Sequence, residues 1–240
     1  MKARAISLFL LVFSSVVSAN SQPSQEVIGK AYDLDSGDLL YVERHRYLAN
    51  KTHEVRYFDP DGKPFARKVL DYSVSENAPS FEQRNDLRGE WIQVTDDGDE
   101  LLLKYQEKTG ETVFDKRFDL SDNLLVDAGF DRYVKNNWQA LNAGSSDMSI
   151  EYLVPSKLTT VGFNVSKVDC LPETPKGAVC FAIAPQSWWV SLAVDPIIVA
   201  YDVSSRNLLR FNGRGNIASA QGKYQSVDIR YEYPEKLAQN

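Results

Sequence analysis

Apolar and polar residues alternate along most of this chain, and short polar turns interrupt the alternation at intervals. Alternation with a period of two is typical of β-strands that bury one face. The pairs Asp61-Gly62, Asp97-Gly98 and Thr109-Gly110 separate successive runs and favour hairpins. The first half of the chain therefore predicts an antiparallel meander made of these runs: VIGKAYDL, DLLYVERHRYL, THEVRYF, FARKVLDYS, GEWIQVT, ELLLKYQE and ETVFDKRFD.

A helical period replaces the alternation between residues 127 and 143. Apolar side chains recur there every three or four residues, which is typical of an amphipathic helix. They are Phe130, Tyr133, Val134, Trp138 and Leu141. We expect Asp127 to cap the start of this helix and Gly144 to end it.

The β pattern resumes after the helix and continues almost to the C-terminus, in these runs: SIEYLVPS, LTTVGFNVSKVD, CFAIAP, SWWVSLAV, IIVAYDV, NLLRFNGRGNI and YQSVDIRYEY. The chain thus predicts a mainly β fold. We expect one large, curved antiparallel sheet of about 10–12 strands, a half-barrel or open barrel, because a long sheet must curl to bury a face. One α-helix near 127–143 would pack on it, and residues 27–240 would form a single β-rich domain.

The N-terminus has the pattern of a secretory signal peptide. Lys2 and Arg4 precede an apolar run, and small residues follow it, so cleavage is expected between Ala19 and Asn20. The alternative is a membrane anchor, but the run is shorter than the ~20 residues that a spanning helix needs. Residues 1–19 are therefore interpreted as a signal peptide and 20–26 as a flexible tail, which predicts a periplasmic or secreted protein.

Charge and hydropathy narrow the class of partner. The formal net charge is −6, and an acidic chain argues against a nucleic-acid partner. No stretch after the signal is apolar over the ~18 residues that indicate a transmembrane helix. We expect no nucleic acid and no transmembrane segment in the mature chain.

The two cysteines, Cys170 and Cys180, lie at the facing ends of two alternating runs. The loop between them is rich in proline and glycine, and an exported protein meets an oxidising environment. The sequence predicts a disulfide at the base of a long hairpin. The alternative, a redox pair, lacks the CxxC spacing.

The sequence contains no GxSxG, HExxH or P-loop motif. His45 and His53 are the two histidines, and the predicted strands place them near Glu43 and Glu54. Such a group is the best candidate for an enzyme or metal site, but arginines on the same strands disfavour a metal cation. The aspartate-rich turns do not match a calcium loop. We expect no catalytic residue, no metal and no cofactor.

The run SWWVSLAVDPIIVAY raises the question of a ligand. Read with a period of two, Trp189, Ser191 and Ala193 share one face, on which a large aromatic is followed by small side chains. That face leaves space for the helix or for an apolar ligand. With Trp138 and Tyr201, these three residues are the candidate ligand-binding set. The alternative is ordinary core packing.

Several C-terminal stretches carry a resemblance to known proteins: VPSKL at 154–158, VDPIIVAYDVSSRNLLRF at 194–211, GRGNI at 213–217 and VDIRYEY at 227–233. In these the chain resembles a family of exported bacterial β-proteins of uncharacterised activity. The order of its elements is also similar to the periplasmic lipoprotein-carrier fold, a curved antiparallel sheet partly closed by helices. The second resemblance implies a hydrophobic concave face able to hold acyl chains.

Two functions follow as hypotheses. The first is an exported, non-catalytic binding or carrier protein for an apolar ligand, such as a lipid or a lipidated chain. The second is an envelope assembly or interaction protein that binds another protein through its sheet. A third and less favoured hypothesis is an enzyme whose active site contains His45 and His53.

Overall fold

A computed structural model describes residues 26–144, 148–188 and 195–234 of the 240-residue chain. Fifteen strands form one sheet, dominated by antiparallel pairs and not closed into a barrel. The first eight are β1 (Glu26–Asp33), β2 (Leu39–Tyr47), β3 (Thr52–Phe58), β4 (Pro64–Asp71), β5 (Ser80–Asn85), β6 (Glu90–Asp96), β7 (Glu100–Gln106) and β8 (Phe114–Asp119). The other seven are β9 (Leu124–Leu125), β10 (Met148–Val154), β11 (Thr159–Val168), β12 (Ala178–Pro185), β13 (Ile197–Asp202), β14 (Leu208–Ala218) and β15 (Tyr224–Glu232).

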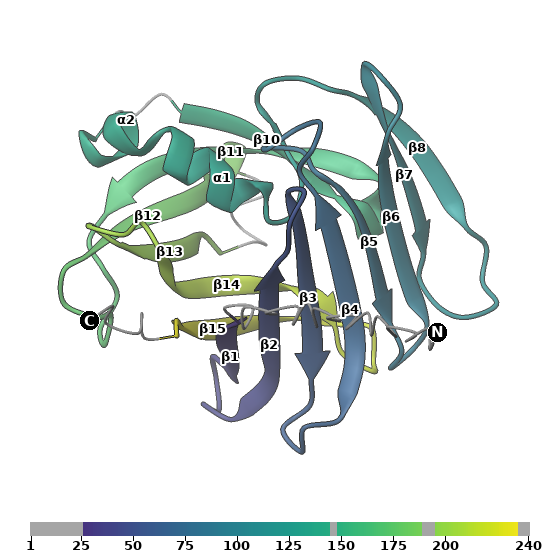
Figure 1. Cartoon of the computed structure of the whole chain (residues 1–240), viewed down its shortest axis with the longest axis horizontal. Helices are drawn as coiled ribbons and strands as arrows, with labels where there is room; N and C mark the ends of the chain where they lie inside the picture. Colours follow the sequence, from purple (N-terminus) through teal and green to yellow (C-terminus); the bar gives the residue numbers. More distant parts are fainter. Residues whose placement is uncertain (1–25, 145–147, 189–194, 235–240) are drawn as a thin grey trace, which may run out of the picture.

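The two ends of the described chain meet in the middle of the sheet. β1 pairs with β15, so β1–β8 extend in one direction and β15–β9 in the other. Strands that neighbour each other in the sheet pair antiparallel, except that β9 lies parallel to β10, and β8 and β9 form its two edges. In Figure 1, β2–β7 stand roughly upright, and β12–β15 run across them. The sheet curls so strongly that Lys116 Nζ of β8 reaches the carbonyl of Leu158 and donates to it (2.9 Å); Leu158 directly follows the 3₁₀ turn η1 (Pro155–Lys157).

The mainly β prediction, with a large curved antiparallel sheet, is confirmed, but the sheet has more strands than expected. β5 lies between two of the predicted runs and shows no clear alternation, because two of its three inward side chains, Gln83 and Asn85, are polar. β9 is two residues long and shows no alternation. Of the predicted strand SWWVSLAV, residues 189–194 lie outside the described residues, as do residues 1–25 with the predicted signal peptide and most of the predicted tail.

The predicted helix is present as two short segments, α1 (Gly129–Asn136) and α2 (Trp138–Asn142). They lie on the side of β10–β12 in Figure 1. The expected cap by Asp127 is wrong: the N-cap is Ala128, and the Asp127 carboxylate instead accepts from Lys68 Nζ of β4 (2.5 Å). Gly144 ends the second segment as expected, with a positive φ of 83°. None of the described helices is long and apolar enough to cross a membrane.

Two hairpin turns near the centre of the sheet use the same aspartate geometry. Asp33 Oδ1 accepts hydrogen bonds from the two backbone amides that follow at 35 and 36, and Asp202 Oδ1 does so from those at 204 and 205. In both hairpins the strand pairing shifts register shortly before the aspartate. The shift lies between Ala31 and Tyr32 in β1, and between Ala200 and Tyr201 in β13. The same local chemistry therefore shapes β1–β2 and β13–β14.

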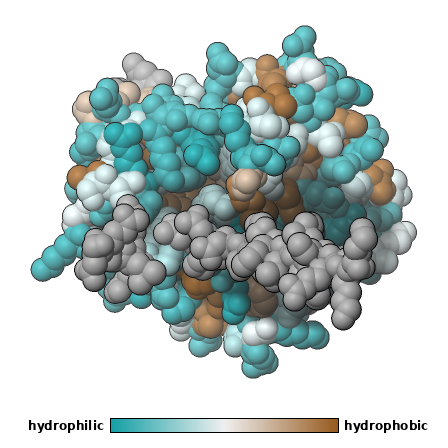
Figure 2. Space-filling view, viewed as in Figure 1, coloured by the Kyte–Doolittle hydropathy of each residue, from teal (hydrophilic) through white to brown (hydrophobic). Residues whose placement is uncertain are grey.

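Inward side chains fill the concave side of the sheet in two hydrophobic clusters. The first gathers residues of β1–β7 with Leu124, Val126, Leu153 and Ile217. The second joins α1 and α2 to β10–β13. Burial of these side chains is the main stabilising term, at about 25 cal/mol per Å² of apolar area. Figure 2 shows hydrophobic residues on the visible surface mostly as small separate patches.

The curl of the sheet is fixed where β5 faces β14. β13 pairs with β14 only from Leu208 to Asn212, and the pairing of β14 with β15 shifts register between Arg214 and Ala218. Carbonyl groups in this stretch therefore need partners outside the ladder. The side-chain amide of Gln83 donates to the carbonyl of Asn216 (3.2 Å), and that of Asn85 donates to the carbonyl of Ala218 (2.7 Å).

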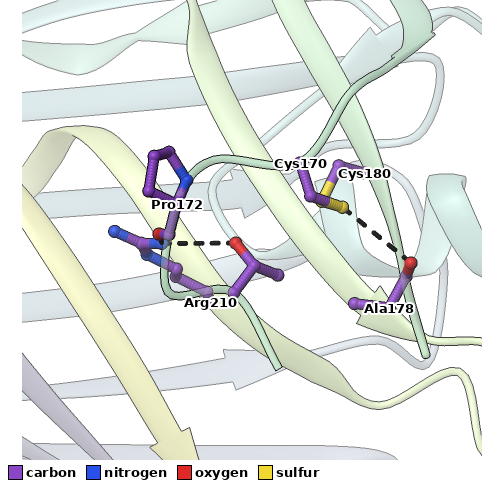
Figure 3. Close-up of a disulfide and its surroundings, with 6 residues drawn as sticks. Cys170, Pro172, Ala178, Cys180 and Arg210 are labelled. Atoms are coloured by element: carbon purple, nitrogen blue, oxygen red, sulfur yellow. Dashed lines mark hydrogen bonds between the residues drawn. A yellow bond between two sulfur atoms is a disulfide. The ribbon is translucent and has the colours of Figure 1, made fainter. Parts of the chain in front are cut away.

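The predicted disulfide is present and joins Cys170 to Cys180, with a Cα–Cα distance of 5.2 Å. It closes the loop between β11 and β12 (Figure 3). Arg210 of β14 reaches this loop and donates to the carbonyl of Pro172 (2.6 Å) and to Thr174 Oγ1 (3.2 Å). A bidentate pair with Asp228 holds the Arg210 guanidinium in place.

Replacing Asn85 with alanine leaves the buried Ala218 carbonyl without its side-chain donor. We expect a loss of about 1–3 kcal/mol in the free energy of unfolding, measured by urea denaturation. Gln221→Ala, which removes an amide from an exposed turn, is the control and should change stability by less than about 0.5 kcal/mol. Equal stability of the Asn85 variant and wild type would show that the contact does not hold β5 to β14.

Cys170→Ser combined with Cys180→Ala removes the cross-link from a short loop. Chain-entropy arguments give a loss of about 2–3 kcal/mol in the free energy of unfolding. Reduction of the wild-type protein with dithiothreitol should lower its unfolding midpoint in the same direction. An unchanged midpoint in both experiments would contradict this account.

Candidate functional site

Strands β2 and β3 direct a carboxylate and two imidazoles into the concave side of the sheet. Glu43 Oε2 lies 3.0 Å from His45 Nε2, and His45 Nδ1 lies 3.1 Å from His53 Nε2. Glu43 also accepts from the hydroxyl of Tyr231 on β15 (3.3 Å). Glu43 and His45 are two residues apart on β2 and so share a face, while His53 comes from the paired strand β3. The chain thus brings together Glu43, His45 and His53, as the sequence proximity of these residues suggested.

Glu54 does not belong to this group. Its strand position places it on the opposite face of the sheet, where it accepts from Arg56 Nε (3.1 Å) and Arg67 Nε (2.9 Å). Burial opposes ionisation of Glu54, but the two arginines outweigh burial and lower its pKa.

The geometry of the two histidines does not suit a metal ion. His45 directs Nε2 to Glu43 and Nδ1 to His53, and the two nitrogens of one imidazole cannot bind the same ion. Among the residues that the structure describes, no group of three or more His, Cys, Asp or Glu side chains is arranged to hold a metal.

Aromatic side chains enclose the two histidines. Tyr47 stacks on His53 with ring centroids 4.3 Å apart, and Tyr231 meets His45 edge-on at 5.7 Å. His53 is 4% exposed. Burial lowers the pKa of His53 well below its usual range, and the nearby His45 and the cations Lys68, Arg132 and Lys135 lower it further.

A second buried pair lies on the same concave side. Lys68 of β4 is 1% exposed, and its Nζ lies 2.5 Å from Asp127 Oδ2. Asn216 of β14 donates to the same carboxylate oxygen (3.3 Å). One local signal points to this pair, since Lys68 stands between Ala66 and Leu70 on the apolar face of FARKVLDYS. Its partner comes from a distant segment, and no local pattern reveals it.

The polar chain from Glu43 to His53 resembles a relay that can pass a proton, but its enclosure limits its chemistry. A general base must reach a substrate proton within hydrogen-bond distance, and His53 is closed off by Tyr47 and neighbouring strands. The arrangement is better suited to fixing the register of β1, β2, β3 and β15, because each buried polar atom demands a specific partner.

The predicted ligand-binding set is partly described. Trp138 and Tyr201 are both buried in the second cluster, with ring centroids 6.0 Å apart, and both also contact Phe181. Trp189, Ser191 and Ala193 lie outside the described residues, so a ligand role for this set stays a prediction.

A mostly apolar pocket of about 150 Å³, partly open to solvent and called the cavity below, lies elsewhere, near the turns that follow β3 and β14. It is lined by Leu40, Tyr41, Asp59, Phe65, Leu87, Ile217, Ala218, Ser219, Ala220 and Gln225. Tyr41 is 5% exposed, and its hydroxyl has no hydrogen-bond partner among the residues that the structure describes. Sequence reasoning missed this site, because its lining residues come from strands and turns far apart in the chain.

A larger hollow of about 390 Å³ lies at the hairpin turn that follows β1, lined by Tyr32, Asp33, Leu34, Gly37, Arg210, Asp228 and Arg230. Its charged side chains already have partners: Arg210 and Arg230 both bind Asp228, and Arg230 also binds Glu173. This hollow therefore has less capacity to bind a ligand by charge than its two arginines suggest.

Protonation of His53 should couple stability to pH. Its folded-state pKa lies below the unfolded value, so the unfolded chain takes up a proton first as the pH falls below about 6.5. As the pH falls below about 6.5, His53 therefore lowers the free energy of unfolding by up to about 1.4 kcal/mol per pH unit. Urea denaturation between pH 7 and pH 5 should show this loss in wild type and a shallower loss in His53→Gln.

Glu90 works in the opposite direction, because burial raises its pKa. Glu90 is present in both the wild-type protein and His53→Gln. The difference between the two slopes of unfolding free energy against pH therefore reports the contribution of His53. Parallel slopes would contradict the assignment of a neutral, buried His53.

No family model and no curated protein matches this chain.

Proposed function

We propose that this chain is an exported, non-catalytic binding protein for an apolar ligand, such as a lipid or a lipidated chain. The cavity between the turns that follow β3 and β14 is the observation that carries the proposal. Its lining is mostly apolar, and Tyr41 supplies an unpartnered hydroxyl to a ligand oxygen. The disulfide is compatible with export, since structural disulfides persist in oxidising compartments.

The volume limits what the cavity holds. An engineered protein cavity of about 150 Å³ binds benzene, so this site accepts one ring or a short branched alkyl group. The two clusters fill the concave side over the described strands with buried side chains. We therefore propose that the ligand inserts its tip here, and that the rest of it lies along the turns at this end of the sheet.

A second candidate function is an envelope assembly protein that binds another chain through its sheet. Strand β8 favours it, because β8 pairs only with β7 among the described strands and leaves one edge open. Phe114 on this strand is 54% exposed, and Val113 just before it is 44% exposed. An open edge can add a strand from a partner, although the charged side chains of β8 discourage indiscriminate pairing.

Toluene is a suitable probe for the cavity. We expect saturable chemical-shift changes in the methyl resonances of Leu40, Leu87 and Ile217 when toluene is added to the purified protein. Ala220→Phe should abolish them, because a ring at this exposed turn position blocks the cavity. Gln221→Phe adds the same ring at a neighbouring position that does not line the cavity, and should leave binding intact.

Absence of saturable shifts in the folded wild-type protein would contradict the proposed cavity function. The open edge of β8 would then be the better-supported binding surface.

A further inference from the structure

Four arginines form a continuous row across the outer face of the sheet. The register pairs Arg44 of β2 with Arg56 of β3, Arg56 with Arg67 of β4, and Arg67 with Arg84 of β5. These strands lie side by side in Figure 1. Neighbouring strands are about 4.8 Å apart, so the row spans about 14 Å.

The row is exposed and carries excess positive charge. The side chains of Arg56, Arg67 and Arg84 are 50%, 62% and 66% exposed. Glu54 forms ion pairs with both Arg56 and Arg67, and Glu82 forms one with Arg84. Arg44 lies over the ring of Phe58 at 4.5 Å, and no carboxylate of the described residues lies within ion-pair distance of it.

Such an arrangement is unfavourable for the fold alone. Like charges directly opposite one another on neighbouring strands destabilise a sheet, and here three consecutive pairs are arginine with arginine. The chain as a whole is acidic, with a net charge of −6, so the row is a local departure from its charge balance. A row of guanidiniums at fixed spacing is, in contrast, well suited to bind carboxylate, sulfate or phosphate groups in bidentate fashion.

The shape of the row favours a linear ligand over a flat anionic surface. The adjacent row includes Glu26 of β1, Glu54 of β3 and Glu82 of β5, with Arg46 of β2 between the first two. A membrane surface would extend over this whole second row, Glu26 included, whereas a narrow chain along the arginines would meet only Glu54 and Glu82, which are already paired with Arg56, Arg67 and Arg84.

Half-buried aromatic rings lie at both ends of the row. Phe58 lies beneath Arg44, and Trp91 of β6 lies beneath Arg84 at 5.8 Å. Trp91 is also the cross-strand partner of Arg84, which makes it the next member of the row. These rings attract the guanidiniums of Arg44 and Arg84 that lie over their faces, and so help to fix the two ends of the row in position.

From these observations we propose that the outer face of β2–β5 binds a linear acidic glycan along the row Arg44–Arg56–Arg67–Arg84. This site lies on the opposite face of the sheet from the cavity beside Tyr41. The proposal does not depend on the function proposed for that cavity.

The test uses the purified mature protein with heparin, a linear sulfated glycan, by isothermal titration at two salt concentrations. Arg44→Gln with Arg84→Gln removes the two ends of the row and keeps the arginines that Glu54 needs. We expect binding to weaken at least tenfold, and the slope of log K against log salt to fall in magnitude by between about 1 and 2. The fold should remain intact by circular dichroism, because the change relieves like-charge pairs.

Lys108→Gln with Lys223→Gln is the matched control, since it makes the same charge change at two exposed turn positions. Heparin binding should weaken less than twofold. Equal weakening in both double variants would overturn the proposal, because net charge alone would then explain the binding. It would also be overturned by tighter binding of polyphosphate than of heparin, or by binding to phosphatidylglycerol vesicles without binding to soluble heparin.

Discussion

The contact between β5 and β14 is the constraint on which the shape of this protein depends. The fifteen described strands form an open sheet whose edges are β8 and β9, and no backbone ladder among the described residues joins these edges. Side-chain amides of Gln83 and Asn85 instead connect β5 to β14 by donating to two carbonyls of β14. Lys68 and Asp127 add a charged contact nearby, to which Asn216 also donates. These polar contacts join the two halves of the curved sheet, and the apolar clusters fill the space between them.

The two faces of the strongly curved half of the sheet carry different kinds of side chain. The concave face carries the apolar clusters, the enclosed Glu43–His45–His53 chain and the small cavity beside Tyr41. The outer face carries the arginine row and the carboxylates that partly neutralise it. Because β-strands alternate their side chains, a single run such as THEVRYF supplies His53 to one face and Arg56 to the other. One ligand site on each face is compatible with a binding protein that contacts a small apolar group and a charged chain independently.

Sequence patterns predicted much of the fold, because alternation, turn pairs and cysteine position are local signals. The disulfide, the helical segment near 127–143 and most strands were found in this way. The failures have a common cause. β5 was missed because Gln83 and Asn85 point inward, and Asp127 was assigned to a helix cap because its true partner, Lys68, lies on a distant strand. The cavity and the arginine row depend on cross-strand register, which no single run of residues encodes.

Hydrogen–deuterium exchange of the folded protein is the most direct test of how the sheet is held. The account predicts slow exchange in residues 80–85 and 213–218, comparable to that of the central strands β1 and β15, because these segments open only when the whole sheet unfolds. Fast exchange confined to 213–218, with β1 and β15 still protected, would show that this part of β14 is a loose edge, and would contradict the closure of the sheet by β5.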